Sequence, residues 1–125
     1  MGHASFHHIE IATEDLSRSC DFYATVLGFV VGDPPKPLPA ETMQWLFDAA
    51  GRPVIHLVQE QGPLADGTVR HLALQCTDKV QVTAQLEVLG TPYEIVDTRG
   101  APFDLIFARD PSGIMLELRF HHGEA

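Results

Sequence analysis

The strongest constraint on the fold of this chain is an internal repeat. The segment HIEIATED at residues 8–15 is followed by a helix-like run that ends at the dipeptide LG, residues 27 and 28. The segment HLALQCTD at residues 71–78 is followed by a similar run that ends at LG, residues 89 and 90. The landmarks keep their order at an offset of 62 or 63 residues. A repeat of this length predicts two copies of one supersecondary unit.

Each copy begins with a strand and then a helix. The first segment of each copy alternates apolar and polar residues, which is typical of a half-buried strand. Asp15 and Asp78, or a nearby threonine in each copy, supply an N-cap oxygen for the helix that follows. Gly28 and Gly90 stand where a left-handed residue commonly ends a helix.

Three further strands are predicted after each helix. In the first copy they cover residues 29–32, 41–48 and 53–59, and in the second they cover residues 92–98, 103–109 and 114–120. The predicted class is α+β, with two βαβββ modules at about residues 5–60 and 69–121. We expect these modules to form one domain over residues 1–125, as a curled eight-stranded mixed sheet around a metal site.

Polar residues gather on one face of the predicted strands. Residues two apart on a strand share a face, so His8, His71 and Glu117 lie opposite the aliphatic side chains of their strands. His56 joins them if Ile55 faces the helix. The neighbour His7 is expected to point the other way, and the terminal residues His3, His121 and His122 are expected to be solvated.

The repeat pairs these polar residues with one another. His8 corresponds to His71, and His56 corresponds to Glu117. Three neutral imidazoles and one carboxylate suit a borderline divalent ion such as Ni, Co, Zn or Fe, and they suit calcium or magnesium poorly. The sequence therefore predicts a metal site formed by these four side chains, although a single histidine on a strand is more often structural.

The composition limits the partners of the chain. Its net charge is −9 without a basic cluster, which disfavours nucleic acid as a partner. No apolar run approaches the roughly 18 residues of a membrane span, and residues 1–8 lack the features of a signal peptide. We therefore expect a cytoplasmic protein that acts on a small molecule, with no membrane partner.

The residues described so far resemble the vicinal oxygen chelate superfamily, which includes glyoxalase I, extradiol dioxygenases and bleomycin-resistance proteins. The resemblance covers nearly the whole chain and is carried by HHIEIATEDLSRSCDFYATVLGF, VIHLV, RHLALQCTD and FARDPSGIMLEL. It implies paired βαβββ modules around a metal, with His8, His71 and Glu117 as ligands. His56 occupies the fourth-strand ligand position, where glyoxalase I has Glu.

The resemblance implies several possible activities. Four protein ligands on a six-coordinate ion leave two adjacent sites for vicinal oxygens, which favours a glyoxalase-like lyase or isomerase with Glu117 moving protons. If His56 is not a ligand, it is available as an acid/base group, and a ring-cleaving dioxygenase becomes the alternative. A metal-free drug-binding protein of the bleomycin-resistance type is the other alternative.

The substrate pocket is less defined by the sequence. The aromatic residues Trp45, Phe103 and Phe107 are candidates to line it, although aromatic residues on strands are more often plain core. Arg99 is a candidate to anchor a carboxylate or phosphate, although a loop arginine is equally often only solvated. The superfamily often builds its sites from two chains, so a homodimer is expected.

Overall fold

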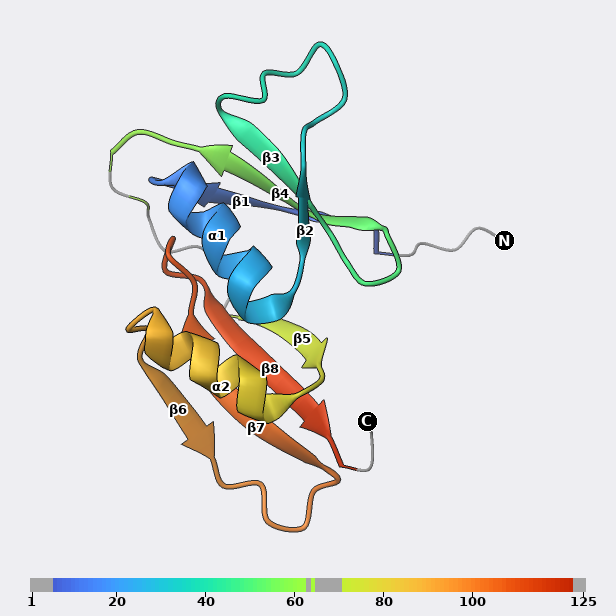
Figure 1. Ribbon diagram of the computed structural model, residues 1–125, viewed down its shortest axis with the longest axis vertical. Helices are drawn as coiled ribbons and strands as arrows, with labels where there is room; N and C mark the ends of the chain where they lie inside the picture. Colours follow the sequence, from blue (N-terminus) through green and yellow to red (C-terminus); the bar gives the residue numbers. More distant parts are fainter. Residues whose placement is uncertain (1–5, 63, 65–70, 123–125) are drawn as a thin grey trace. The chain divides into compact units, whose positions relative to one another are not determined.

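The computed structural model describes residues 6–62, 64 and 71–122. The chain divides into two compact units, Met1–Leu64 and Ala65–Ala125. Each unit contains one copy of the repeat (Figure 1). Among the described residues, no helix has the length and apolar character needed to cross a membrane.

The first unit has the predicted βαβββ order. Its elements are β1 (Ile9–Thr13), α1 (Leu16–Leu27), β2 (Val30–Gly32), β3 (Met43–Phe47) and β4 (Pro53–Gln59). The strands form a four-stranded sheet in the order β1-β4-β3-β2. The β1 and β4 strands are parallel, and the other neighbours are antiparallel.

The second unit repeats this plan. Its elements are β5 (Leu72–Cys76), α2 (Lys79–Val88), β6 (Tyr93–Val96), β7 (Phe103–Arg109) and β8 (Met115–His121). The sheet order is β5-β8-β7-β6, with β5 and β8 parallel. The α+β class and the two βαβββ modules are thus confirmed, and the eight strands form two four-stranded mixed sheets.

The helices begin and end at the predicted caps. The side chain of Asp15 accepts a hydrogen bond from Arg18 N at 3.1 Å, and that of Asp78 accepts one from Gln81 N at 3.1 Å. Gly28 has φ of 73°, a left-handed conformation that costs glycine little. Its backbone N–H closes the last turn of α1 by donating to Ala24 O.

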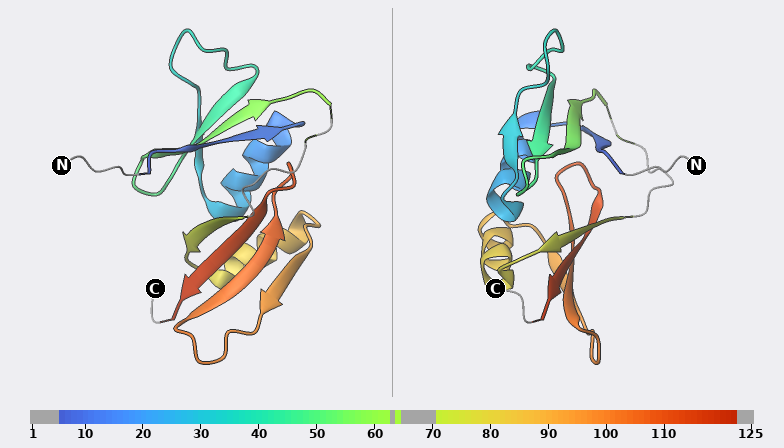
Figure 2. Two further views of the ribbon diagram at one scale, coloured as in Figure 1. Left: turned by 180° about the vertical axis from the view of Figure 1, so that it is seen from behind. Right: turned by 90° about the vertical axis from the view of Figure 1, so that its right-hand side faces the viewer.

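Each helix covers one face of its own sheet (Figures 1 and 2). In the first unit the buried residues of β1, β3 and β4 alternate with less buried ones; the buried set is Ile11, Thr13, Leu46, Ile55 and Leu57. In the second unit the buried strand residues are Ile106, Ala108, Leu116, Leu118 and Phe120. The alternate residues of each sheet therefore lie on its helix-distal face.

Candidate functional site

The helix-distal face of the first sheet brings Glu10, Trp45 and His56 together. His56 in β4 pairs with Glu10 in β1 and with Trp45 in β3, and paired residues share a face. His8 lies one residue before β1, two positions before Glu10. This face therefore carries two of the four predicted metal ligands.

The rings of His8, Trp45 and His56 are in contact with one another. The Trp45 and His56 rings are stacked, with centroids 4.5 Å apart and an interplanar angle of 6°. The His8 ring meets Trp45 edge to face at 4.7 Å, and its centroid is 6.4 Å from that of His56. The first unit thus places two imidazoles side by side against one indole.

Both ring nitrogens of His56 have neighbours. Nδ1 lies 3.5 Å from Glu10 Oε1, and Nε2 lies 3.3 Å from Met43 Sδ. Both neighbours can only accept a hydrogen bond, so the proton of a neutral His56 ring is directed at either Glu10 or Met43. The side chain of His56 is only 12% exposed, so these contacts replace most of its hydration.

The expected orientation of His7 is wrong. Its Nδ1 lies 2.8 Å from His8 Nδ1, and the two rings meet edge to face. Strand alternation does not apply here because β1 begins only at Ile9. In this contact one Nδ1 donates a hydrogen bond to the other. At least one of the two Nδ1 atoms therefore carries a proton.

A buried donor on the same face has no partner among the residues that the structure describes. Trp45 Nε1 is buried without a hydrogen bond within that part of the chain. An unsatisfied buried N–H costs free energy, so such groups commonly mark a place for a ligand, ion or water. Its position between two imidazoles fits a site that binds a small polar molecule or a metal-bound ligand.

The helix-distal face of the second sheet contains Glu117. In β8, Glu117 pairs with Ala73 of β5 and with Phe107 of β7. His71 lies one residue before β5, two positions before Ala73. The side chain of Glu117 is 15% exposed. This unit contains the other two predicted ligands.

Arg119 lies next to Glu117 on this face. Its Nη1 donates to Glu117 Oε2 at 3.1 Å, and its guanidinium carbon lies 4.0 Å from the centroid of the Phe103 ring. The cation is therefore held by a carboxylate and by an aromatic face. Phe103 and Phe107, both predicted to line the pocket, occupy this same face of β7.

The repeat reappears in the strand register. Trp45 pairs with His56 in the first sheet, and Phe107 pairs with Glu117 in the second. Each unit thus sets one candidate ligand directly beside one aromatic ring. Among the described residues there is no group of three or more His, Cys, Asp and Glu that could hold a metal ion, so the meeting of all four ligands stays a prediction.

Arg99 lies in the loop between β6 and β7. It donates from Nη2 to Asp97 Oδ2 at 2.6 Å, and its side chain is 91% exposed. Hydrogen bonds from Arg99 lower the pKa of the Asp97 carboxyl. The predicted role of Arg99 as an anion anchor stays untested.

Two residues of these faces were not assigned a role from the sequence, namely Glu10 and Arg119. Glu10 lies two positions after His8, and Arg119 lies two positions after Glu117, so strand alternation predicts that each shares the face of that ligand. Their contacts depend on side-chain conformations and on strand register, which the sequence pattern does not give.

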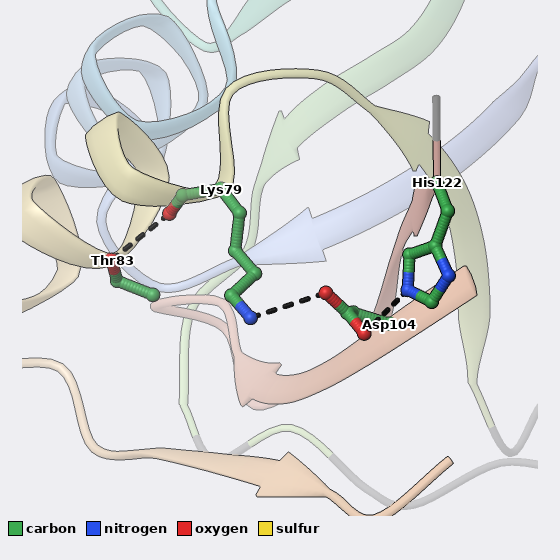
Figure 3. A network of polar contacts seen from close by, with 4 residues as sticks. All are labelled: Lys79, Thr83, Asp104 and His122. Carbon is green, nitrogen blue, oxygen red and sulfur yellow. Dashed lines mark hydrogen bonds and ion pairs between the residues drawn. The ribbon is translucent and has the colours of Figure 1, made fainter. Parts of the chain in front are cut away.

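A separate polar cluster lies on the other side of the second sheet. The Asp104 carboxylate binds Lys79 Nζ at 3.2 Å and His122 Nε2 at 2.9 Å (Figure 3). Hydrogen bonds from His122 and Lys79 lower the pKa of Asp104. These residues line a cleft together with Cys76 and Phe120. His122, expected to be solvated, also makes a hydrogen bond with Asp104.

The comparisons with known proteins agree with this architecture. A family model described as the glyoxalase/bleomycin resistance protein/dioxygenase superfamily matches residues 5–118. The chain is 32% identical to glyoxylase I 4 of Arabidopsis thaliana, over 91% of this chain and 69% of the relative. It is 24% identical to a lactoylglutathione lyase of Pseudomonas putida, over 90% of this chain and 83% of the relative.

A solved structure shows the same fold at low sequence identity. It is a variant of the fosfomycin resistance protein FosX from Listeria monocytogenes, complexed with Mn(II) and 1S,2S-dihydroxypropylphosphonic acid. The two folds superpose with a TM-score of 0.70 at 18% identity, covering 98% of this chain and 95% of the other. Family model, relatives and fold together show that the chain belongs to the glyoxalase/bleomycin resistance protein/dioxygenase superfamily, whose fold is the vicinal oxygen chelate fold.

Proposed function

We propose that the protein is a metal-dependent lyase or isomerase of the glyoxalase type that acts on a small compound with vicinal oxygens. The observation that carries the proposal is the repeated register of His56 beside Trp45 and of Glu117 beside Phe107. Relatives named glyoxylase I and lactoylglutathione lyase support the same class of reaction.

The residues present fit a divalent ion. His8, His56, His71 and Glu117 would hold it, and three imidazoles with one carboxylate favour Ni, Co, Zn or Fe over calcium or magnesium. The unsatisfied Trp45 Nε1 beside His8 and His56 supports a bound polar group on this face. Mn(II) is present in the related FosX complex.

The proposed chemistry is proton transfer next to a carbonyl. When bound, the ion supplies a Lewis acid that stabilises negative charge on the vicinal oxygens. Glu117 is the one carboxylate among the four residues, so we assign it the removal of the proton from carbon and its return to the neighbouring carbon. Among the described residues, Arg119 contacts Oε2 of Glu117, and Oε1 is proposed for this role.

His56 has a second role within the proposal. A proton on Nδ1, directed at Glu10, would leave the lone pair on Nε2, and this nitrogen would then bind the ion or accept a proton from substrate. Trp45, Phe103 and Phe107 supply apolar walls that exclude water from the reacting groups. We also propose that the enzyme is a homodimer, for which light scattering should give twice the chain mass of 13.7 kDa.

Elemental analysis of tag-free protein tests the proposal. We expect stoichiometric divalent metal in the wild type and at least about a tenfold weaker affinity in Glu117→Gln, because the variant loses a charged ligand. Turnover of the adduct of a 2-oxoaldehyde with a thiol should be lost together with the metal. The matched control is Glu41→Gln, at an exposed position between β2 and β3.

Other outcomes would replace the proposal. Unchanged metal content and activity in Glu117→Gln would remove Glu117 from the site. Cleavage of a catechol that depends on ferrous iron would favour the dioxygenase. Protein that holds no metal, and whose thermal stability does not rise with added nickel, cobalt or zinc, would favour a drug-binding protein.

A further inference from the structure

We propose that Arg119 binds a carboxylate of the substrate, so that the substrate is a small acid whose carboxylate lies close to its vicinal oxygens. The inference deepens the proposed function and rests on it. It assigns the anion anchor to a residue on the helix-distal face of β8 instead of to Arg99 in the β6–β7 loop.

The position of Arg119 supports this role. It follows Glu117 by two residues, so the two backbone positions are separated by about 6.6 Å along the strand. Its long side chain closes this gap, because Nη1 reaches Glu117 Oε2 at 3.1 Å. A molecule that is bound at Glu117 therefore lies within reach of the guanidinium.

The guanidinium is held in place and still has donors to offer. Its carbon lies over the Phe103 ring, 4.0 Å from the centroid, and the Arg119 side chain is 32% exposed. A guanidinium has five N–H donors, and among the described residues of this unit only Nη1 has a hydrogen-bond partner. The remaining donors form the planar fork that binds a carboxylate through two hydrogen bonds.

Three other lysine and arginine side chains of the second unit that the structure describes are engaged elsewhere. Arg99 is paired with Asp97 and Lys79 with Asp104, while Arg109 donates to Gly113 O at 2.7 Å. The net charge of −9 repels anions at long range. A substrate acid therefore needs a local cation, and among the described arginines and lysines of this unit Arg119 is the one in contact with a predicted ligand.

The charge balance favours a carboxylate over a phosphate or phosphonate. In the proposal Glu117 is a ligand of the divalent ion, so the single positive charge of Arg119 balances a monoanion but only half of a dianion. A carboxylate has a single negative charge, and its planar shape matches the fork. We therefore assign the anchor to monoanionic acids.

Two hydroxamates test the assignment on the full chain loaded with cobalt. Acetohydroxamate and malonic acid monohydroxamate chelate a metal through the same two oxygens, and only the second has a carboxylate. The dissociation constants are measured from the cobalt absorption spectrum of wild type, Arg119→Gln, Arg119→Lys and the matched control Arg99→Gln. Cobalt is kept saturating, so that any change in metal affinity does not affect the comparison.

We expect the wild type and Arg99→Gln to bind the carboxylate probe about tenfold more tightly than acetohydroxamate. Arg119→Gln should lose this preference without weaker binding of acetohydroxamate, and Arg119→Lys should keep part of it. A wild type without the preference, or a preference that survives in folded Arg119→Gln, overturns the role of Arg119 alone. Failure of the wild type to take up cobalt overturns the proposed function and this inference with it.

Discussion

At the scale of single residues, His56 shows how an imidazole is accommodated within an apolar strand. Burying a polar ring without partners costs about 1 to 3 kcal/mol. Here Trp45 covers one face of the ring, Met43 contacts Nε2, and Glu10 contacts Nδ1. The ring therefore keeps a defined orientation on the helix-distal face of the first sheet, which a metal ligand or an acid/base group requires.

Cys76 provides a test at the same scale. Burial raises the pKa of its thiol to about 11, and the thiolate is the reactive form. We expect Ellman's reagent to label folded Cys20→Ala protein at neutral pH about a hundredfold more slowly than the same protein unfolded in urea. Equal rates in the two states would show that the thiol is accessible and unshifted.

At the scale of elements, the N-caps explain where the helices begin. Asp15 caps α1 through Arg18 N, and the buried hydroxyls of Thr13 and Ser19 lie 2.7 Å apart just beside this cap. The end of β1 and the first turn of α1 are thereby joined by short-range polar contacts. Such local contacts let each unit specify its own strand–helix connection.

Replacing the cap should weaken the first unit. We expect Asp15→Ala to lower the free energy of unfolding by about 1 kcal/mol, because the first turn of α1 loses an acceptor for its free N–H groups. Urea denaturation followed by circular dichroism measures the change. Glu14→Ala, at the exposed neighbouring position, is the control and should unfold like the wild type; an equal loss in both variants would contradict the capping role.

Most of the elements could be predicted from the sequence, because each is encoded locally. The β4 and β7 strands have the predicted bounds, since alternation and flanking turn residues agree there. The β6 strand is shorter than predicted, at Tyr93–Val96, because Asp97 turns to bind Arg99. The contacts of Glu10 and Arg119 could not be predicted from the sequence. They depend on which strands pair and on the conformations of these long side chains.

At the scale of the whole molecule, the acidic chain neutralises many of its basic groups internally. Arg52, Lys79, Arg99 and Arg119 each form an ion pair with an aspartate or glutamate. Among these pairs, Asp104 joins three parts of the second unit, because Lys79 begins α2, Asp104 lies in β7 and His122 follows β8 (Figure 3). Stability should therefore depend on the charge of Asp104.

The direction of this pH dependence follows from the lowered pKa of Asp104. Its contribution to stability is complete above the ordinary aspartate pKa of 3.8 and is lost as the pH falls through the lower folded-state pKa. We expect Asp104→Asn to melt at a lower temperature than wild type at pH 7, with the difference disappearing in strong acid. Asp21→Asn, at an exposed position of α1, should match the wild type; a difference for Asp104→Asn that persists in strong acid would contradict an ionic cause.

The register that sets His56 beside Trp45 and Glu117 beside Phe107 has a stereochemical consequence for the proposed enzyme. Two identical copies of a module would bind a small-molecule guest equally well in two opposite orientations. An imidazole at one position and a carboxylate at the other remove that equivalence, since the two ends of the guest then meet different groups. A prochiral compound would accordingly be processed on a single face, and the product would form as one enantiomer.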